Sequence, residues 1–398
     1  MAAAKRATYV AFIATGFGIA SWASRIPQYK TRLGLDASQL GLLLLALAAG
    51  SVIALPLCGP LVARVGSRRT IVAMAVLAGV ALCIVAGGYE LGVAVVGVGL
   101  FMFGMANGAW DVAMNVQGAT VERQLGRAML PRFHAGFSLG TVAGALVGVV
   151  AVAVGLPVTV HLAIVGILVA VLTHRAVRAF LPDRGERAHV TGVRGALTPW
   201  RERRTLLIGV VVLAFAFAEG SGNDWIGVAM VEGHGTRVTF GILGFATFLG
   251  AMTVGRWLGP RLIDSYGRVL VLRALAVVMV LGVALFAYGR NIEVAFVGVT
   301  LWGTGVSLGF PVGMSAGADE PGAAAARVAV ISSIGYCAFL GGPPLIGFLG
   351  QRYTVAHALL AVAVAAAIAC AVMAVVRPLA SLAGDDGRVD ATARRADP

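Results

Sequence analysis

Long apolar stretches recur along the whole chain, and short polar segments separate them. A run of about 20 apolar residues is long enough to cross the hydrocarbon core of a bilayer as a helix. The pattern therefore predicts an all-α integral membrane protein with twelve membrane-spanning helices. We place these helices at residues 8–24, 39–59, 70–89, 92–117, 135–155, 158–174, 205–223, 238–258, 270–289, 293–316, 328–350 and 355–376.

The composition narrows the function classes. Hydrophobic residues make up 59% of the 398 positions and charged residues only 12%, about half the charged share of an average soluble domain. A soluble enzyme, a disordered protein and a secreted disulfide scaffold are excluded. The four cysteines and six histidines have no metal-ligand spacing, and no phosphate-binding loop motif occurs. We therefore expect no cofactor, no metal and no enzymatic activity.

The formal net charge of +13 comes from basic residues that concentrate in alternate loops. Among these we count Arg256, at the cytoplasmic end of the eighth predicted span, and Arg261 after it. Basic residues gather in cytoplasmic loops of membrane proteins, so we expect a multi-pass protein of the bacterial inner membrane with both termini cytoplasmic. A nucleic-acid binder would carry its basic residues on one folded face. The first span could also be a cleaved signal peptide, which would leave eleven spans.

A loop motif occurs twice. Residues 59–69 follow the second span and residues 259–268 follow the eighth, and each copy combines glycines with arginine. Two parallel six-helix repeats are a known transporter plan. We therefore predict an N-terminal half, a cytoplasmic linker, a C-terminal half and a disordered cytoplasmic tail, with boundaries at residues 1–177, 178–204, 205–377 and 378–398.

These loops resemble the signature loops of the major facilitator superfamily. The C-terminal copy keeps the acid of that signature, Asp264, and the N-terminal copy has Ala63 in its place. The resemblance implies the major facilitator fold. It also implies that the loops gate the cytoplasmic side through Arg64, Arg68, Arg69, Asp264 and Arg268.

Within the superfamily, the chain resembles the fucose permease-like branch. Ile26 and Pro27 follow the first span as in that branch, and the fourth span contains Asp111 followed by Asn115. In the branch, an acid followed four residues later by asparagine is linked to proton coupling. Two features differ from the branch: Val116 stands where sugar permeases often have proline, and the first span has no acid.

Acidic side chains inside spans are few, and Asp111 and Glu219 are the two that lie well inside. An ionised side chain at the bilayer centre costs about 2.5–3.5 kcal/mol or more, so such residues face a cavity or a partner. Asp111 shares one helix face with Asn107 and Asn115. We expect Asp111 and Glu219 to couple protons. The alternative is a fixed hydrogen-bond cluster between helices.

The resemblance implies that spans one, four, seven and ten line a central cavity. Polar and aromatic side chains on or near these spans are the substrate-binding candidates, although aromatic rings also anchor helices at the membrane interface. The candidates are Asn107, Trp110, Asn115, Trp22, Asn223, His134, Trp302 and Tyr336.

Two further features concern helix contacts. Arg25 ends the first span, and we expect it to gate the outer side by pairing with Glu219 or Asp111; the alternative is that it reaches the lipid headgroups.

Glycine recurs at every fourth position from Gly136 to Gly148, which predicts close packing against another helix.

The sequence thus predicts a secondary active transporter that works by alternating access. We expect a monomer in the lipid bilayer that couples a small polar, sugar-like solute to protons by symport; sodium stays open as the coupling ion. The alternatives are a proton-driven efflux antiporter for a drug or metabolite and, more remotely, a membrane sensor or scaffold that transports nothing.

Overall fold

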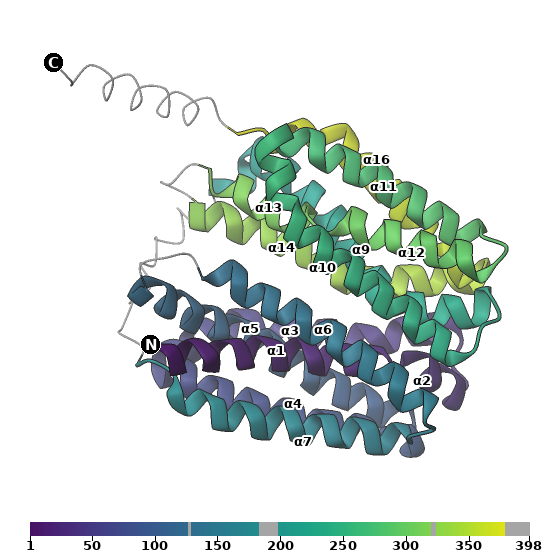
Figure 1. Cartoon of the computed structure of the whole chain (residues 1–398), viewed down its shortest axis with the longest axis horizontal. Helices are drawn as coiled ribbons and strands as arrows, with labels where there is room; N and C mark the ends of the chain where they lie inside the picture. The colour runs from purple at the N-terminus through teal and green to yellow at the C-terminus, as the bar shows by residue number, and fades with distance from the viewer. Residues whose placement is uncertain (126–128, 183–197, 320–323, 379–398) are drawn as a thin grey trace.

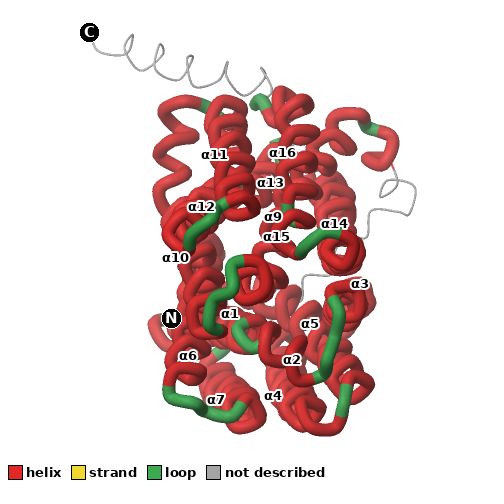
Figure 2. The backbone as a smooth tube through the Cα atoms, turned by 90° about the vertical axis from the view of Figure 1, so that its right-hand side faces the viewer, coloured by secondary structure: helices red, strands yellow, loops and turns green. Residues whose placement is uncertain are grey.

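A computed structural model of the chain describes residues 1–125, 129–182, 198–319 and 324–378. These residues form helices and no strand (Figure 2), and twelve helical segments are long and apolar enough to span a membrane. The prediction of twelve spans in an all-α membrane fold is confirmed. The predicted tail 378–398 and most of the predicted linker lie outside the described residues.

The first half contains six spans, of which the first is interrupted. Its helices are α1 (Ala2–Ala23), α2 (Ile26–Arg32), α3 (Ala37–Val65), α4 (Ser67–Leu91), α5 (Val93–Leu125), α6 (Leu130–Ala153) and α7 (Val158–Ala176). The 3-10 turn η1 (Val177–Ala179) follows. Pro27 lies in the first turn of α2, where its missing N–H leaves no helix hydrogen bond unmade.

The second half repeats this plan, with the tenth and twelfth spans interrupted. It begins at the short turn η2 (Thr198–Arg201) and ends at η4 (Met373–Val376). Its helices are α9 (Arg203–Gly233), α10 (Val238–Tyr266), α11 (Arg268–Tyr288), α12 (Ile292–Val306), α13 (Gly309–Gly317), α14 (Ala324–Arg352), α15 (Val355–Ala358) and α16 (Leu360–Val372).

Several helices are longer than the apolar runs that predict them. The helix α9 continues to Gly233 and α10 continues to Tyr266, beyond the predicted ends at residues 223 and 258. In α9 the polar residues Glu219, Asn223 and Asp224 interrupt the apolar run. A span predicted from hydrophobicity alone therefore ends in the middle of α9, although the helix and its backbone hydrogen bonds continue.

The two halves lie side by side and contact each other through symmetry-related pairs of helices (Figure 1). Helix α3 packs on α14, and α6 packs on α10. These are spans two with eleven and five with eight, so the pairs exchange under the half-repeat. We call the end of the bundle that carries α2 the α2 end and the end that carries both chain termini the termini end.

The repeated loop motif has the same backbone shape in both halves. Gly66 joins α3 directly to α4 with φ 87°, and Gly267 joins α10 directly to α11 with φ 79°. A positive φ is adopted readily only by glycine. A single glycine therefore turns the chain between two spans at both places.

The glycines of α6 bring it into backbone contact with α1. A Cβ atom added at Gly140 would lie 2.2 Å from the carbonyl oxygen of Ile13, and one at Gly144 would lie 2.5 Å from that of Phe17. The predicted close packing is confirmed. Without side chains between them, the two helices gain van der Waals contact along their whole backbones.

This contact predicts that Gly140→Leu destabilises the protein. Overpacking a tight contact costs about 1–3 kcal/mol, so we expect a lower melting temperature and less monodisperse protein in size-exclusion chromatography. Gly250→Ala in α10 is the control, because an added Cβ there meets nothing within 4 Å. Equal melting temperatures for the two variants would contradict the assigned packing.

Candidate functional site

A polar cluster lies near the middle of α5 and at the start of α6. The Asn115 side-chain N–H donates to the backbone oxygen of Asp111 at 2.8 Å and to its carboxylate at 3.3 Å. The Asn115 oxygen then faces His134 Nε2 at 3.1 Å. Because an amide oxygen only accepts, His134 donates through its Nε2–H. These hydrogen bonds fix the orientations of the Asp111, Asn115 and His134 side chains relative to one another.

Asp111 has no cationic partner within this cluster. Among the described residues, no ion pair reaches its carboxylate, and no group of three potential metal ligands occurs. Its one side-chain hydrogen bond comes from the neutral amide of Asn115. The arrangement leaves a carboxyl group in the bundle interior without a charged partner among the described residues.

The second half contributes an ion pair. The Arg256 guanidinium on α10 donates through Nη2 to both carboxylate oxygens of Glu219 on α9, at 2.9 and 3.0 Å. Its Nε donates to the backbone oxygen of Ser307 at 3.2 Å, where the tenth span breaks between α12 and α13. Both side chains are only partly exposed.

Arg256 is the residue that the sequence analysis misplaced. We counted it among the loop arginines, but α10 continues ten residues further to Tyr266, which is about 15 Å of helix. A carboxylate inside the membrane needs a partner, and this requirement could have identified Arg256. Glu219 is such a carboxylate, and Arg256 lies on the next helix in the chain.

The two clusters come from opposite halves and approach each other. Helix α6, which carries His134, packs on α10, which carries Arg256. We therefore group Asp111, Asn115 and His134 of the first half with Glu219, Arg256 and Tyr336 of the second half. We call these six residues the central site. Five of them are sequence-predicted candidates that the structure brings together.

The remaining predicted ligands lie elsewhere. The side chains of Trp22, Trp110 and Trp302 are at most 2% exposed. Trp22 packs edge-on against Tyr29, and Trp302 packs against Phe248 and Phe286. Asn107 is buried beside the site, and its N–H donates to the carbonyl of Phe103 at 2.8 Å. In this conformation the three indoles pack in the helix bundle and do not line the central site.

The expected pairing of Arg25 with Glu219 or Asp111 is wrong for this conformation. Arg25 is fully buried; its Nε donates to His161 Nδ1 at 2.9 Å and its Nη1 to Gln28 at 2.7 Å. The physical reason is depth. Glu219 lies in the middle of the long helix α9, whereas Arg25 lies at the turn between α1 and α2, so neutral groups of its own half bind it.

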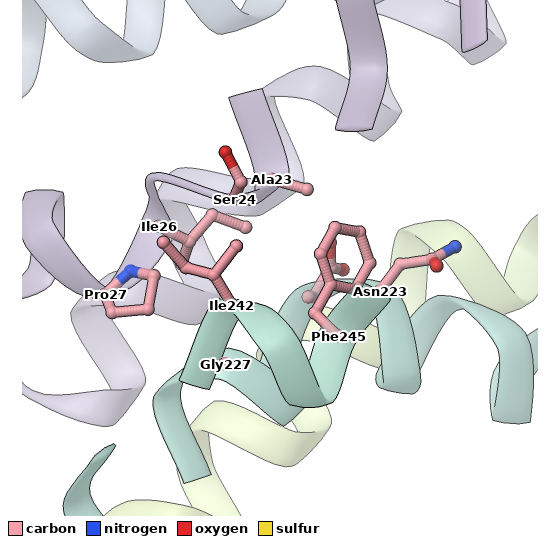
Figure 3. Close-up of a pocket in the computed structure, with 9 residues that line it drawn as sticks. Ala23, Ser24, Ile26, Pro27, Asn223, Gly227, Ile242 and Phe245 are labelled. Atoms are coloured by element: carbon pink, nitrogen blue, oxygen red, sulfur yellow. The ribbon is translucent and has the colours of Figure 1, made fainter. Parts of the chain in front are cut away.

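The halves close against each other at the α2 end. Asn223 and Phe245 lie opposite Ser24 and Pro27 in a narrow crevice (Figure 3). A Cβ atom at Gly41 would lie 2.5 Å from the carbonyl oxygen of Pro343. Lys30 forms an ion pair with Glu232 across the same end. Toward the termini end the ribbons of the two halves diverge (Figure 1).

At the termini end, Arg268 of the repeated loop motif pairs with an acid that lies outside the motif. Arg64, Arg68, Arg69 and Asp264 are exposed. Arg268 donates to Asp319 at 2.8 Å, and Arg204 donates to the other oxygen of the same carboxylate at 2.8 Å. Asp319, which the sequence analysis did not single out, therefore links the starts of α9 and α11.

The closure at the α2 end predicts that Gly347→Val opens it. An added Cβ at Gly347 would lie 2.5 Å from the carbonyl oxygen of Ala37, so valine should hold α14 and α3 apart. A reporter cysteine, Ser24→Cys in a background without the four native cysteines, should then react several-fold faster with maleimide, since Ser24 is 1% exposed. Gly341→Val on the same helix is the control, because nothing lies within 4 Å of that position. An unchanged labelling rate would disprove this gate.

The buried Arg25 predicts that His161→Phe lowers the melting temperature. The substitution leaves a guanidinium N–H without an acceptor in an apolar environment, which costs about 1–3 kcal/mol. His174→Phe on the same helix changes an exposed histidine and should have little effect. Equal stability of the two variants would show that the Arg25–His161 hydrogen bond contributes nothing.

Comparisons with known proteins agree with this architecture. The family model of the Major Facilitator Superfamily matches residues 8–337. An uncharacterised MFS-type transporter of Yersinia pestis is 35% identical over 354 residues, which cover 86% of this chain and 88% of that protein.

Solved structures show the same fold. A crystal structure of the nucleoside transporter NupG has a TM-score of 0.75 at 15% identity and covers 93% of this chain and 98% of that one. The transporter FucP in an outward conformation has a TM-score of 0.63 at 16% identity, with 94% and 100% covered. The chain is a multi-pass membrane protein that belongs to the Major Facilitator Superfamily of transporters.

Proposed function

We propose that the chain is a secondary active transporter that carries a small polar solute across the bacterial inner membrane by symport with protons. The observation that carries this proposal is the carboxyl of Asp111, which lies in the bundle interior without a cationic partner among the described residues. The solute would bind at the central site, where both halves contribute side chains. The transporter would act as a monomer, use no cofactor and catalyse no covalent reaction.

Protonation of Asp111 supplies the coupling. An unpaired carboxylate in an apolar interior is costly, and a proton removes its charge. A proton and a solute move together only if their binding favours one orientation of the halves over the other. Asp111 would act on the interface between the halves through its charge, because the proposed site takes side chains from both halves.

The conformation in hand supports alternating access. The halves are closed at the α2 end and diverge at the termini end. The arginine-rich loops lie at the termini end, and by the charge bias of membrane proteins that end is cytoplasmic. The structure would then be the inward-facing state, in which His134 is exposed beside the site. Figure 2 views the opposite, closed end.

The sugar-like preference has two supports. The central site offers hydrogen-bonding groups from both halves. The structure named as the E. coli fucose:proton symporter FucP, and that of the nucleoside transporter NupG, share this fold. Both likenesses are below 25% identity and concern the fold.

Asp111→Asn should abolish proton-driven accumulation while solute exchange across the membrane continues, because the amide cannot gain or lose a proton. The assay uses purified protein in proteoliposomes with a pH-sensitive dye inside and a panel of hexoses and polyols outside. Glu90→Gln is the control, since Glu90 pairs only with Arg32 on an exposed surface.

Each outcome of this assay separates the alternatives. Internal acidification by one compound, lost in Asp111→Asn, establishes symport. Alkalinisation of the lumen under an inwardly directed solute gradient would indicate antiport. Uptake driven by a sodium gradient alone would replace the proton with sodium. Full proton-driven uptake by Asp111→Asn would refute the role of Asp111.

A further inference from the structure

We propose that the Glu219–Arg256 ion pair sets the charge selectivity of the central site, so that the site rejects anionic solutes and takes an uncharged, hydroxyl-bearing one. This inference rests on the proposed transport function and narrows its substrate class. It assigns the pair a role in specificity, separate from the protonation of Asp111.

The first step concerns the guanidinium. Arginine binds carboxylate and phosphate groups through two parallel N–H bonds. In this site the protein's own Glu219 carboxylate already accepts two bonds from Arg256, and the Ser307 carbonyl accepts a third. An anionic solute would have to displace Glu219 or bind next to its negative charge.

The second step concerns the net charge. Arg256 is the cation of the central site, and Glu219 cancels it. Asn115 and Tyr336 offer hydrogen bonds without charge. With His134 in its neutral form, the sum is zero when Asp111 carries a proton and negative when Asp111 is ionised. In neither state does the site hold a positive charge to offset the desolvation of an anion.

The third step concerns the donors that remain. The guanidinium has five N–H bonds, and its hydrogen bonds to the described residues use Nη2 and Nε, not Nη1. A neutral hydroxyl can accept from Nη1 without disturbing Glu219. The chemistry therefore fits a polyhydroxylated solute with no net charge.

The test removes the carboxylate charge without changing its shape. Glu219→Gln should release Arg256 to bind an organic anion. We would measure the melting temperature of purified protein with sodium glucuronate, using sodium chloride of equal ionic strength as the reference. We expect no glucuronate-dependent shift in the wild type and a saturable shift in Glu219→Gln, with an apparent affinity at least ten-fold higher. The double variant Glu219→Gln, Arg256→Gln should lose this shift.

Two results would overturn the proposal. A glucuronate shift in the wild type that Arg256→Gln abolishes would show that Arg256 already serves anions. A folded Glu219→Gln protein with no shift would show that Glu219 is not what excludes them. If Glu219→Gln does not fold, the wild type and Arg256→Gln still decide the point, because an Arg256-dependent shift refutes the exclusion and its absence supports it. Binding is measured here without a proton gradient, so failure of proton coupling leaves a separate signature in the Asp111→Asn assay.

Discussion

The high cost of an ionisable group inside an apolar helix bundle governs this structure. Each such group must find a partner or lose its charge. Glu219 and Arg256 satisfy each other through a bidentate contact. Arg25 is satisfied by the neutral groups of His161 and Gln28. Asp111 has only the amide of Asn115, and among the described residues no ion pair reaches its carboxylate. The same cost thus separates charges that have a partner from carboxyls that have none, and the proposed function assigns proton coupling to one of the latter, Asp111.

Small residues explain how two six-helix units can be rigid and still move relative to each other. Within the first half, α6 contacts α1 at Gly140 and Gly144 with backbone against backbone, which holds the helices together without long side chains. Between the halves, the closure at the α2 end also uses backbone, at Gly41 against Pro343. Backbone atoms pack closely, but they do not interdigitate as long side chains do. The contact between α3 and α14 can therefore form and separate without repacking the interior of either half.

The sequence predicted the parts of the site that lie along one helix. The spacing of Asp111 and Asn115 places them one turn apart, and the structure joins them by hydrogen bonds. It could not predict the partners that come from other helices. Arg256 was counted with the cytoplasmic arginines because the predicted span ends two residues after it, and Trp302 was a ligand candidate although it packs among Phe248 and Phe286. Whether an aromatic residue faces a cavity or a neighbouring helix depends on the rotation of its helix, which hydropathy along an all-apolar span does not encode.

The two halves carry different charge chemistry on the same repeated scaffold. The loop glycines Gly66 and Gly267 have matching backbone shapes, but the first half has an acid without a cation and the second half has an acid with one. Asp111 lies on α5 of the first half and the Glu219–Arg256 pair joins α9 and α10 of the second, so the proposed site takes its charges from both halves. Under the proposed function, the ion pair keeps Glu219 and Arg256 bound to each other in the second half, while the coupling proton binds Asp111 in the first half.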